Sequence, residues 1–169
     1  MPAHYRAWVE ILRPHGIVFP EKRFYSMGGM PTGEIVEKLF YEVGKIPDVP
    51  ILTRQKEEAF IEKLGEIRPV EKVVEVACRN RGISPMAVAS GGHRHIVELT
   101  LRQIGVLGWF SVLVAAEDTV RHKPEPDVFL EAARRLGVIP AECTVYEDTE
   151  LGIEAARRAG MRWVDVRKM

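Results

Sequence analysis

The sequence predicts an α/β fold in two parts, a helical N-terminal part and a C-terminal part built on a parallel sheet. Up to about Arg68, apolar residues recur at the spacing of amphipathic helices, and no segment requires a strand. After Pro69, short apolar runs alternate with segments of helical periodicity. This alternation is typical of a parallel sheet covered by helices on both faces. We therefore expect a small helical domain over residues 1–68 and an α/β core over residues 69–169.

Three apolar stripes predict the helices of the first part, because residues three or four apart share one face of a helix. They are Trp8, Ile11 and Leu12; Ile35, Val36, Leu39, Phe40 and Val43; and Phe60, Ile61 and Leu64. Between the first two stripes, residues 26–33 read SMGGMPTG. The glycines and the proline disfavour a helix, so we expect an ordered turn or loop there.

In the second part, four apolar runs predict strands, and the segments between them predict helices. The expected strands are residues 86–89, 112–116, 144–146 and 163–166. The expected helices are residues 73–78, 93–103 and 127–136 and one that ends at Gly160. Ligands of such sheets bind beyond the carboxyl ends of the strands. The candidate site is therefore sought at Ser90, in the loop around Lys123 and at Glu147 and Asp148.

The composition argues against several classes of partner. The chain of 169 residues has 24 basic and 24 acidic residues, so no net field draws it to nucleic acid or to an acidic membrane. We find neither a signal peptide nor an apolar run of the roughly 18 residues that a membrane span needs. Cys78 and Cys143 lie in separate apolar stretches, a pattern that predicts buried, reduced thiols. We expect a monomeric cytoplasmic protein that acts on a small molecule.

Ser90 follows a predicted buried strand and precedes Gly91, Gly92 and a helix. Its hydroxyl and the next backbone N–H groups could converge on a phosphate oxygen. Serine is also a favoured helix N-cap residue, so capping is the competing interpretation.

Lys123 lies in the loop sequence HKPEPD. Prolines at positions 124 and 126 stiffen the loop, so the lysine loses little freedom when it binds an anion. It could neutralise a phosphoryl group and a carboxylate together; the alternative is a solvated surface lysine.

Glu147 and Asp148 are adjacent carboxylates at the end of a predicted strand. Mg²⁺ binds such oxygen ligands and commonly keeps several of its waters. The alternative is that Asp148 caps the following helix. His93 and His95 are two residues apart on a predicted helix, so we do not expect them to share a face or to bind zinc.

Three of these features occur in a fixed order: a serine after a strand, then HKPEPDVF, then YEDTELGIEAARRAGM. In this order they resemble the second, third and fourth motifs of the haloacid dehalogenase superfamily. The helical part resembles the small cap of that family. The opening residues PAHYRAW look like the stretch that follows the first motif in β-phosphoglucomutases and related sugar phosphatases. The resemblance covers the whole chain and implies a Rossmann-like core with a helical cap.

The resemblance implies a role for each candidate residue. Ser90 and Lys123 would hold the transferring phosphoryl group. Glu147 and Asp148 would serve an Mg²⁺ site, with Asp148 as the more direct ligand. The implied substrate-binding residues are His4, Thr32, Lys56, Gly91, His93 and Arg94.

The first motif of the family, D-x-D-G-T-x-x-D-T, would end directly before Met1 and is not among these 169 residues. In the family its first aspartate is the nucleophile and its second is the general acid/base. Because the reaction passes through an aspartyl-phosphate, we expect the chain as printed to be inactive. The same segment would carry a central strand, so we also expect a split sheet with exposed strand edges.

The resemblance implies a Mg²⁺-dependent phosphatase of small sugar phosphates. β-Phosphoglucomutase is an alternative, but related mutases have an arginine in the cap loop where Thr32 stands, and G-x-P-T is similar to the fructose 1-phosphate phosphatase branch. A dehalogenase fits less well, since Lys123 and the two acids suit metal-assisted phosphoryl chemistry. A phosphosugar-binding protein without turnover is an alternative from another class.

Overall fold

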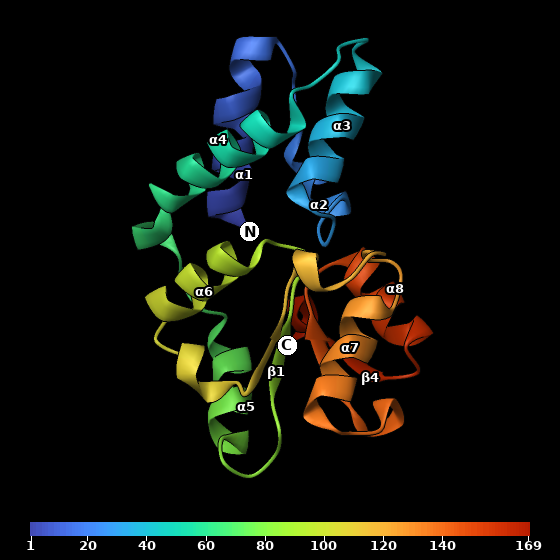
Figure 1. Cartoon of the computed structure of the whole chain (residues 1–169). Helices are drawn as coiled ribbons and strands as arrows, with labels where there is room; N and C mark the ends of the chain where they lie inside the picture. Colours follow the sequence, from blue (N-terminus) through green and yellow to red (C-terminus); the bar gives the residue numbers. More distant parts are fainter.

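The computed structural model describes residues 1–169, and its first half consists of helices only (Figure 1). This confirms that no strand is needed before Pro69. The helices are α1 (Pro2–Leu12), α2 (Glu21–Ser26), α3 (Thr32–Glu42) and α4 (Val49–Ile61), with 3-10 turns at Arg13–His15 and Leu64–Glu66. Leu64, which was predicted to continue the third stripe, therefore lies beyond the end of α4.

Most residues of the apolar stripes in the first half form one core, but Val43 and Ile61, which were predicted to belong to the stripes, are exposed. The side chains of Trp8, Leu12, Val36, Leu39 and Phe60 are almost fully buried in it, as predicted. Full burial of a large apolar side chain stabilises a fold by roughly 1.5–3 kcal/mol. Helix α4 packs against both α1 and α3, and the Asp48 carboxylate caps it by accepting a hydrogen bond of 3.1 Å from the Ile51 N–H.

The glycine-rich loop is shorter than predicted. Ser26 ends α2, a helix that the sequence pattern did not indicate, and Thr32 begins α3. Only residues 27–31 form the turn. Gly33 lies inside α3. A residue without a side chain suits this position because α4 passes close to it: a Cβ atom there would be 3.2 Å from the Val49 Cγ1 atom. We call residues 27–31 the glycine turn.

The second half is the predicted alternation of helices and strands. Its elements are α5 (Glu71–Asn80), β1 (Ala87–Ala89), α6 (Arg94–Gln103), β2 (Val112–Val114), α7 (Asp127–Leu136), β3 (Thr144–Glu147), α8 (Glu150–Arg158) and β4 (Arg162–Asp165). Each strand and helix expected from the sequence is present in its expected order, with boundaries shifted by a few residues. The α/β fold class is confirmed.

The strands pair in two parallel sheets of two strands each, β1 with β2 and β3 with β4. Ala87 is opposite Val112, and Thr144 is opposite Arg162. No ladder joins β1 or β2 to β3 or β4, as expected for a sheet that is split in its middle. Helices α7 and α8 still pack together through a shared apolar cluster that includes Val114, Phe129 and Ala155.

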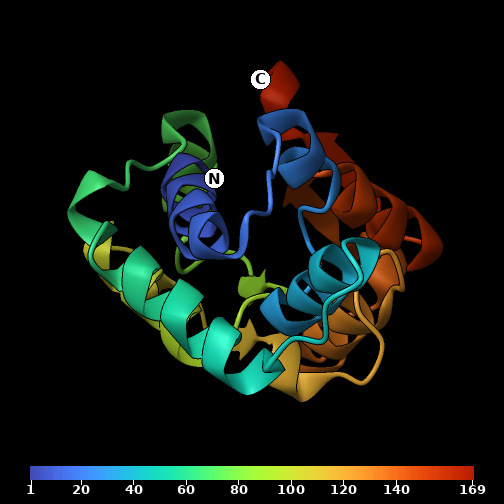
Figure 2. The same cartoon turned by 90° about the horizontal axis from the view of Figure 1, so that it is seen from above.

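The helical half covers the loops that follow the strands. Seen from above, α4 lies over α6, and α3 lies over the side of the core that carries α7 (Figure 2). The chain start also lies at this boundary (Figure 1). None of the helices is both long and apolar enough to cross a bilayer.

The cysteines do not have the burial that the sequence suggested. Cys78 is exposed and Cys143 is half-buried, and both are free thiols. Cys78 lies on α5, which has no fully buried residue. The prediction of buried thiols was therefore wrong, because an apolar sequence neighbourhood does not show which helix face is covered.

Candidate functional site

Ser90 lies at the end of β1, where its N–H donates to the Val114 carbonyl oxygen at 2.9 Å. Its Oγ accepts a hydrogen bond of 3.1 Å from the Gly92 N–H. Helix α6 begins only at Arg94, with His93 as its N-cap residue. The competing interpretation of Ser90 as a helix cap was therefore wrong, and the serine instead closes a tight turn directly after the strand.

Lys123 is a buried cation and not a surface lysine. The residue is 6% exposed, and its Nζ atom lies 2.7 Å from Glu147 Oε2. The same Nζ atom lies 3.5 Å from the Ala89 carbonyl oxygen and 4.7 Å from the centre of the Phe129 ring. The ammonium group thus links the end of β1 to the end of β3. It bridges the two half-sheets at the edge where the sequence placed the site.

Glu147 uses both oxygens within the protein. Oε1 accepts hydrogen bonds from the Asp148 N–H at 3.1 Å, the Thr149 N–H at 3.0 Å and the Thr149 hydroxyl at 2.7 Å. Burial by itself would raise the pKa of the Glu147 carboxyl, but the Lys123 ammonium and these hydrogen bonds bring that pKa below its ordinary value. Glu147 is therefore an ionised partner of Lys123, which the sequence interpretation as a metal residue did not foresee.

Thr149 and Gly152 support this carboxylate, and sequence reasoning missed both. Thr149 is the N-cap of α8, where its hydroxyl accepts from the Gly152 N–H at 3.0 Å. The cap is thus one residue later than the alternative interpretation of Asp148 as a helix cap. A Cβ atom on Gly152 would overlap the Glu147 side chain. The available signal was a threonine followed three residues later by glycine, D-T-E-L-G.

Asp148 has no cationic side chain bonded to it. Burial, and then the charge of the adjacent Glu147, raise the pKa of its carboxyl above the ordinary value. Burial lowers the pKa of the Met1 amino group, and the charge of Asp148 partly opposes this. No three acidic, histidine or cysteine side chains converge in a ready-made metal site. One under-neutralised carboxylate nevertheless fits Mg²⁺, which often takes one or two protein carboxylates and keeps its waters.

On the helical side, His4 and Lys56 form a buried pair, with the Lys56 Nζ atom 2.9 Å from His4 Nδ1. The His4 ring stacks on Phe60 at a centroid distance of 3.8 Å. Burial, followed by the charges of Lys56 and the Met1 amino group, lowers the pKa of His4 well below its ordinary value. The imidazole is therefore neutral and can accept a hydrogen bond from the ammonium group. Burial also lowers the pKa of Lys56, to about 8.

The glycine turn lies directly on the strand-end residues. A Cβ atom on Gly28 would be 2.6 Å from Thr149 Cγ2, and one on Gly29 would be 3.1 Å from Lys123 Cδ. Gly29 has a φ of 97°, which disfavours any side chain, and a Cβ atom on Gly91 would overlap the Gly29 carbonyl oxygen. Glycines on both sides therefore allow the two halves to meet through backbone atoms.

One predicted substrate-binding residue, Arg94, is bound away from this cluster. The Arg94 guanidinium pairs with the Asp118 carboxylate at 2.5 Å and lies 3.3 Å from the Leu113 carbonyl oxygen, so it is bound to the β2 side of the core. Thr32 is the buried first residue of α3, directly after the glycine turn.

His93 and His95 do share a side, which corrects the argument from helical spacing. His93 precedes the helix, and its Nδ1 atom lies 2.6 Å from Glu57 Oε1, while His95 Nε2 lies 3.4 Å from Glu57 Oε2. The helical period does not apply to an N-cap residue, whose backbone is extended.

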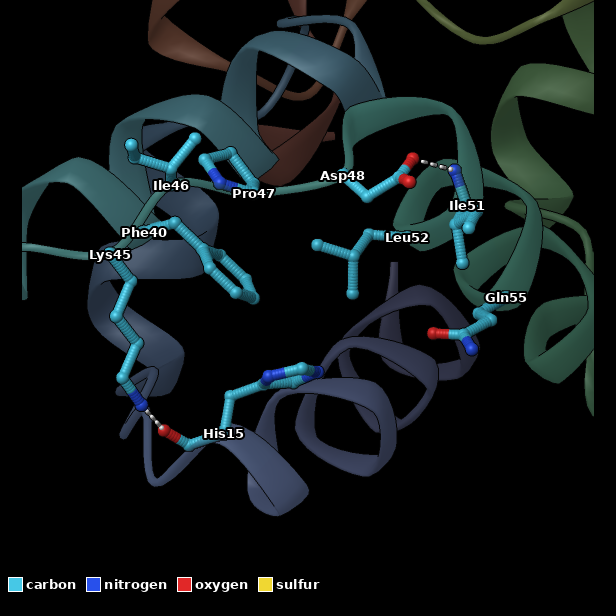
Figure 3. Close-up of a pocket in the computed structure, with 9 residues that line it drawn as sticks. All are labelled: His15, Phe40, Lys45, Ile46, Pro47, Asp48, Ile51, Leu52 and Gln55. Atoms are coloured by element: carbon cyan, nitrogen blue, oxygen red, sulfur yellow. Dashed lines mark hydrogen bonds between the residues drawn. The ribbon is translucent and has the colours of Figure 1, made fainter.

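A pocket of about 410 Å³ lies at the far end of the helical half (Figure 3). Its walls include Phe40 and Leu52, and its Lys45 and Asp48 side chains are hydrogen-bonded to backbone groups. None of the predicted site residues lines it. A second pocket of about 350 Å³ lies between the halves, where Met27 and Met30 of the glycine turn meet Lys123.

Comparison with known proteins identifies relatives over nearly the whole chain. The chain is 37% identical over 166 residues to the fructose-1-phosphate phosphatase YqaB of Escherichia coli, covering 98% of this chain and 88% of that protein. It is 27% identical to the phosphorylated carbohydrates phosphatase of Thermotoga maritima, covering 95% of this chain and 75% of that protein.

Among solved structures, the fold is similar to β-phosphoglucomutase from Clostridium difficile. The TM-score is 0.84 at 22% identity, and the match covers 96% of this chain and 76% of that one. A family model described as haloacid dehalogenase-like hydrolase matches residues 1–160. The chain therefore belongs to the haloacid dehalogenase-like hydrolase family.

Proposed function

We propose that this chain carries the substrate-binding and phosphoryl-binding residues of a Mg²⁺-dependent phosphatase that acts on small sugar phosphates. The observation that carries the proposal is the buried Lys123–Glu147 pair at 2.7 Å, which lies beside Ser90 and Asp148 at the strand ends. Two relatives are named for phosphatase activity on fructose 1-phosphate and on phosphorylated carbohydrates, which supports this class of substrate.

In this proposal Lys123 and Ser90 bind the transferring phosphoryl group. The Lys123 ammonium is held by Glu147, so it needs little rearrangement when negative charge develops on the phosphoryl oxygens. The Ser90 hydroxyl and the N–H groups of the following glycine residues, Gly91 foremost, would donate to the same oxygens.

Asp148 would hold the metal directly, since its carboxylate, unlike that of Glu147, forms no ion pair with a basic side chain. Glu147 serves the metal site indirectly, because its oxygens already bind Lys123 and Thr149. When bound, Mg²⁺ would supply positive charge against the phosphoryl oxygens. The residues of the chain orient the substrate and fix the Lys123 ammonium.

The helical half, residues 1–68, would act as a cap that excludes water from the reaction. The glycine turn already contacts Lys123 and Gly91, which places cap backbone over the strand ends. His4 and Lys56 would face the sugar part of the substrate. Since the Lys56 pKa is about 8, its charge is weakly held, and an anionic substrate would stabilise it.

The 169 residues contain no carboxylate at this site that is free to act as a nucleophile, since Glu147 is paired and Asp148 is assigned to the metal. We therefore propose that these residues alone do not turn over phosphomonoesters. The charge of Asp148 acts on the pKa of the Met1 amino group, so the chain start and the candidate metal site are electrostatically coupled. A chain extended there with D-x-D-G-T-x-x-D-T would gain the nucleophile.

The test compares three proteins: the 169-residue chain, the extended chain, and an extended chain whose first motif aspartate is asparagine. Phosphate release from fructose 1-phosphate and other hexose monophosphates is measured with Mg²⁺. Only the extended chain should be active. Phosphate release by the 169-residue chain that disappears in Asp148→Ala would contradict the proposed inactivity, and an inactive but folded extended chain would contradict the proposed reaction.

β-Phosphoglucomutase activity is the alternative supported by the likeness in fold. A mutase must grip the second phosphate of its bisphosphate intermediate, for which the fork of an arginine is suited. Thr32 offers only a hydroxyl. Isomerisation of glucose 1-phosphate faster than hydrolysis, measured in the extended chain with the bisphosphate activator, would favour the mutase.

A further inference from the structure

Glu57 is a buried carboxylate whose partners all lie on the opposite half of the molecule. It lies on α4, one residue after Lys56, and the residue is only 8% exposed. Its carboxylate contacts His93 at 2.6 Å and His95 at 3.4 Å, and no other hydrogen bond or ion pair involves it. These histidines belong to the core, at the start of α6, which lies under α4 in Figure 2.

Burial of a carboxylate is costly unless it is paired and hydrogen-bonded. The pairing of Glu57 therefore exists only while the two halves are together; if they separate, the carboxylate returns to water and both imidazoles lose their partner. The contact is thus coupled to closure of the helical half over the strand ends.

The same contact reaches the phosphate-binding turn. His93 follows Ser90, Gly91 and Gly92, and Gly91 is the residue on which the glycine turn rests. Glu57 therefore restrains the helix end of this short turn at His93, while the hydrogen bond from the Ser90 N–H to the Val114 carbonyl oxygen restrains the strand end.

A second glutamate–histidine pair lies on the other side of the boundary but is weaker. The His122 Nε2 atom is 3.7 Å from Glu34 Oε1, and the Glu34 side chain is 46% exposed. A pair that is exposed and this distant contributes little, whereas Glu57 is almost enclosed.

We propose that Glu57 is a positioning residue: through His93 and His95 it ties the helical half to the Ser90–His93 turn and keeps that turn seated for phosphoryl binding. The kinetic consequence rests on the proposed function, but the conformational one does not. The groups around the carboxylate are His93 and His95 on the core side and Lys56 on its own helix.

The test measures hydrogen–deuterium exchange in the 169-residue chain at one fixed pH. Glu57→Ala should raise exchange in residues 27–31 and 90–93 on the order of tenfold, within the range of typical couplings between sites. His93→Gln should raise it in the same two segments. The matched control is Glu58→Ala, which removes the same charge from an exposed neighbour paired with Arg54 at 3.9 Å; it should leave both segments unchanged.

The location of the change separates positioning from a merely structural role. Glu57→Ala and His93→Gln should raise exchange in the two segments and leave the rest of the chain unchanged. Equal exchange in Glu57→Ala and Glu58→Ala, or a rise spread evenly over α1, α3 and α7, would overturn the proposal. No substrate is needed, so the result holds whether or not the proposed phosphatase activity is found.

In the active extended chain, Glu57→Ala and His93→Gln should each lower kcat/KM about tenfold, and the double variant should be no worse than either one. Additive losses would mean that the two residues act separately, contrary to the proposal.

Discussion

Two lysines of this protein are buried to the same degree but have opposite surroundings. Lys123 in the core is 6% exposed and Lys56 in the helical half is 5% exposed. Lys123 lies 2.7 Å from the ionised Glu147, whereas the nearest polar partner of Lys56 is the neutral His4 imidazole at 2.9 Å. Lys123 is held in an ion pair, whereas Lys56 has none, although the charge of Glu57 acts on it. The difference teaches that equal burial does not give two lysines the same state, because burial without an ion pair lowers the pKa of Lys56.

The largest expected effect on stability comes from breaking the ion pair between Lys123 and Glu147. Lys123→Met should lower the free energy of unfolding by about 3–5 kcal/mol, because it leaves Glu147 buried without a partner. Urea unfolding measures this change. The double variant with Glu147→Gln should recover most of the loss. If the single and double variants were equally unstable, the pair would not be the source of the effect.

Removing the charge of Lys56 should instead raise the free energy of unfolding. The folded pKa of Lys56, about 8, lies below its ordinary 10.5, so its charged form is disfavoured in the folded state. The cost is fully present below pH 8 and disappears as the pH rises toward 10.5. Lys56→Met should therefore stabilise the chain at pH 7 by up to roughly 3 kcal/mol.

The sharpest check of this prediction is its pH dependence. Unfolding free energy of the unaltered chain should rise between pH 8 and pH 10.5 relative to Lys56→Met, and the two should converge at the upper end. A Lys56→Met variant less stable than the unaltered chain at pH 7 would show that packing of the lysine stem outweighs the cost of its charge.

Asp148 extends the comparison to a carboxylate. Burial and the charge of Glu147 raise the pKa of Asp148, so Mg²⁺ bound there would relieve an existing repulsion. At a Mg²⁺ concentration about 100 times the dissociation constant, the folded state should gain roughly 2.7 kcal/mol. Thermal unfolding with and without Mg²⁺ measures this gain, which Asp148→Asn should abolish. An undiminished gain in Asp148→Asn would locate the metal elsewhere.

The smallest effect tests how Glu147 is seated. Gly152→Ala places a methyl group where the Glu147 side chain lies, and overpacking of this kind costs about 1–3 kcal/mol even though alanine favours helices. Gly65→Ala is the control, since no atom lies within 4 Å of a Cβ there. Thermal unfolding of both variants should show destabilisation only for Gly152→Ala; equal stability would mean that the carboxylate moves aside at no cost.

The strand-end part of this arrangement could be predicted from the sequence. Ser90, Lys123 and Asp148 each follow an apolar run, and the carboxyl ends of parallel strands meet at one edge, so periodicity alone brings them together. The helical stripes were equally informative, since Trp8 and Phe60 are buried as their spacing indicated.

The partners of these residues could not be predicted. Lys123 and Glu147 are 24 residues apart, and Lys56 and His4 are 52 apart, so only the packing of separate elements decides which charge meets which group. Likewise, no local pattern marks Glu57, which looks like any glutamate on an exposed helix face until α6 is placed beneath it. Pairing across elements is a tertiary property, and a charge gives no periodic signal when it is buried singly.

The contact of Gly29 with Gly91 has a consequence for engineering. At this point the two halves meet through main-chain atoms, because a Cβ atom on Gly91 would overlap the Gly29 carbonyl oxygen. Neighbouring side chains such as Met30 and Thr32 are not part of that backbone contact. Exchanging Met30 would change the lining of the pocket between the halves while the backbone contact is preserved, so side chains of the glycine turn can be varied provided that its glycines are left in place.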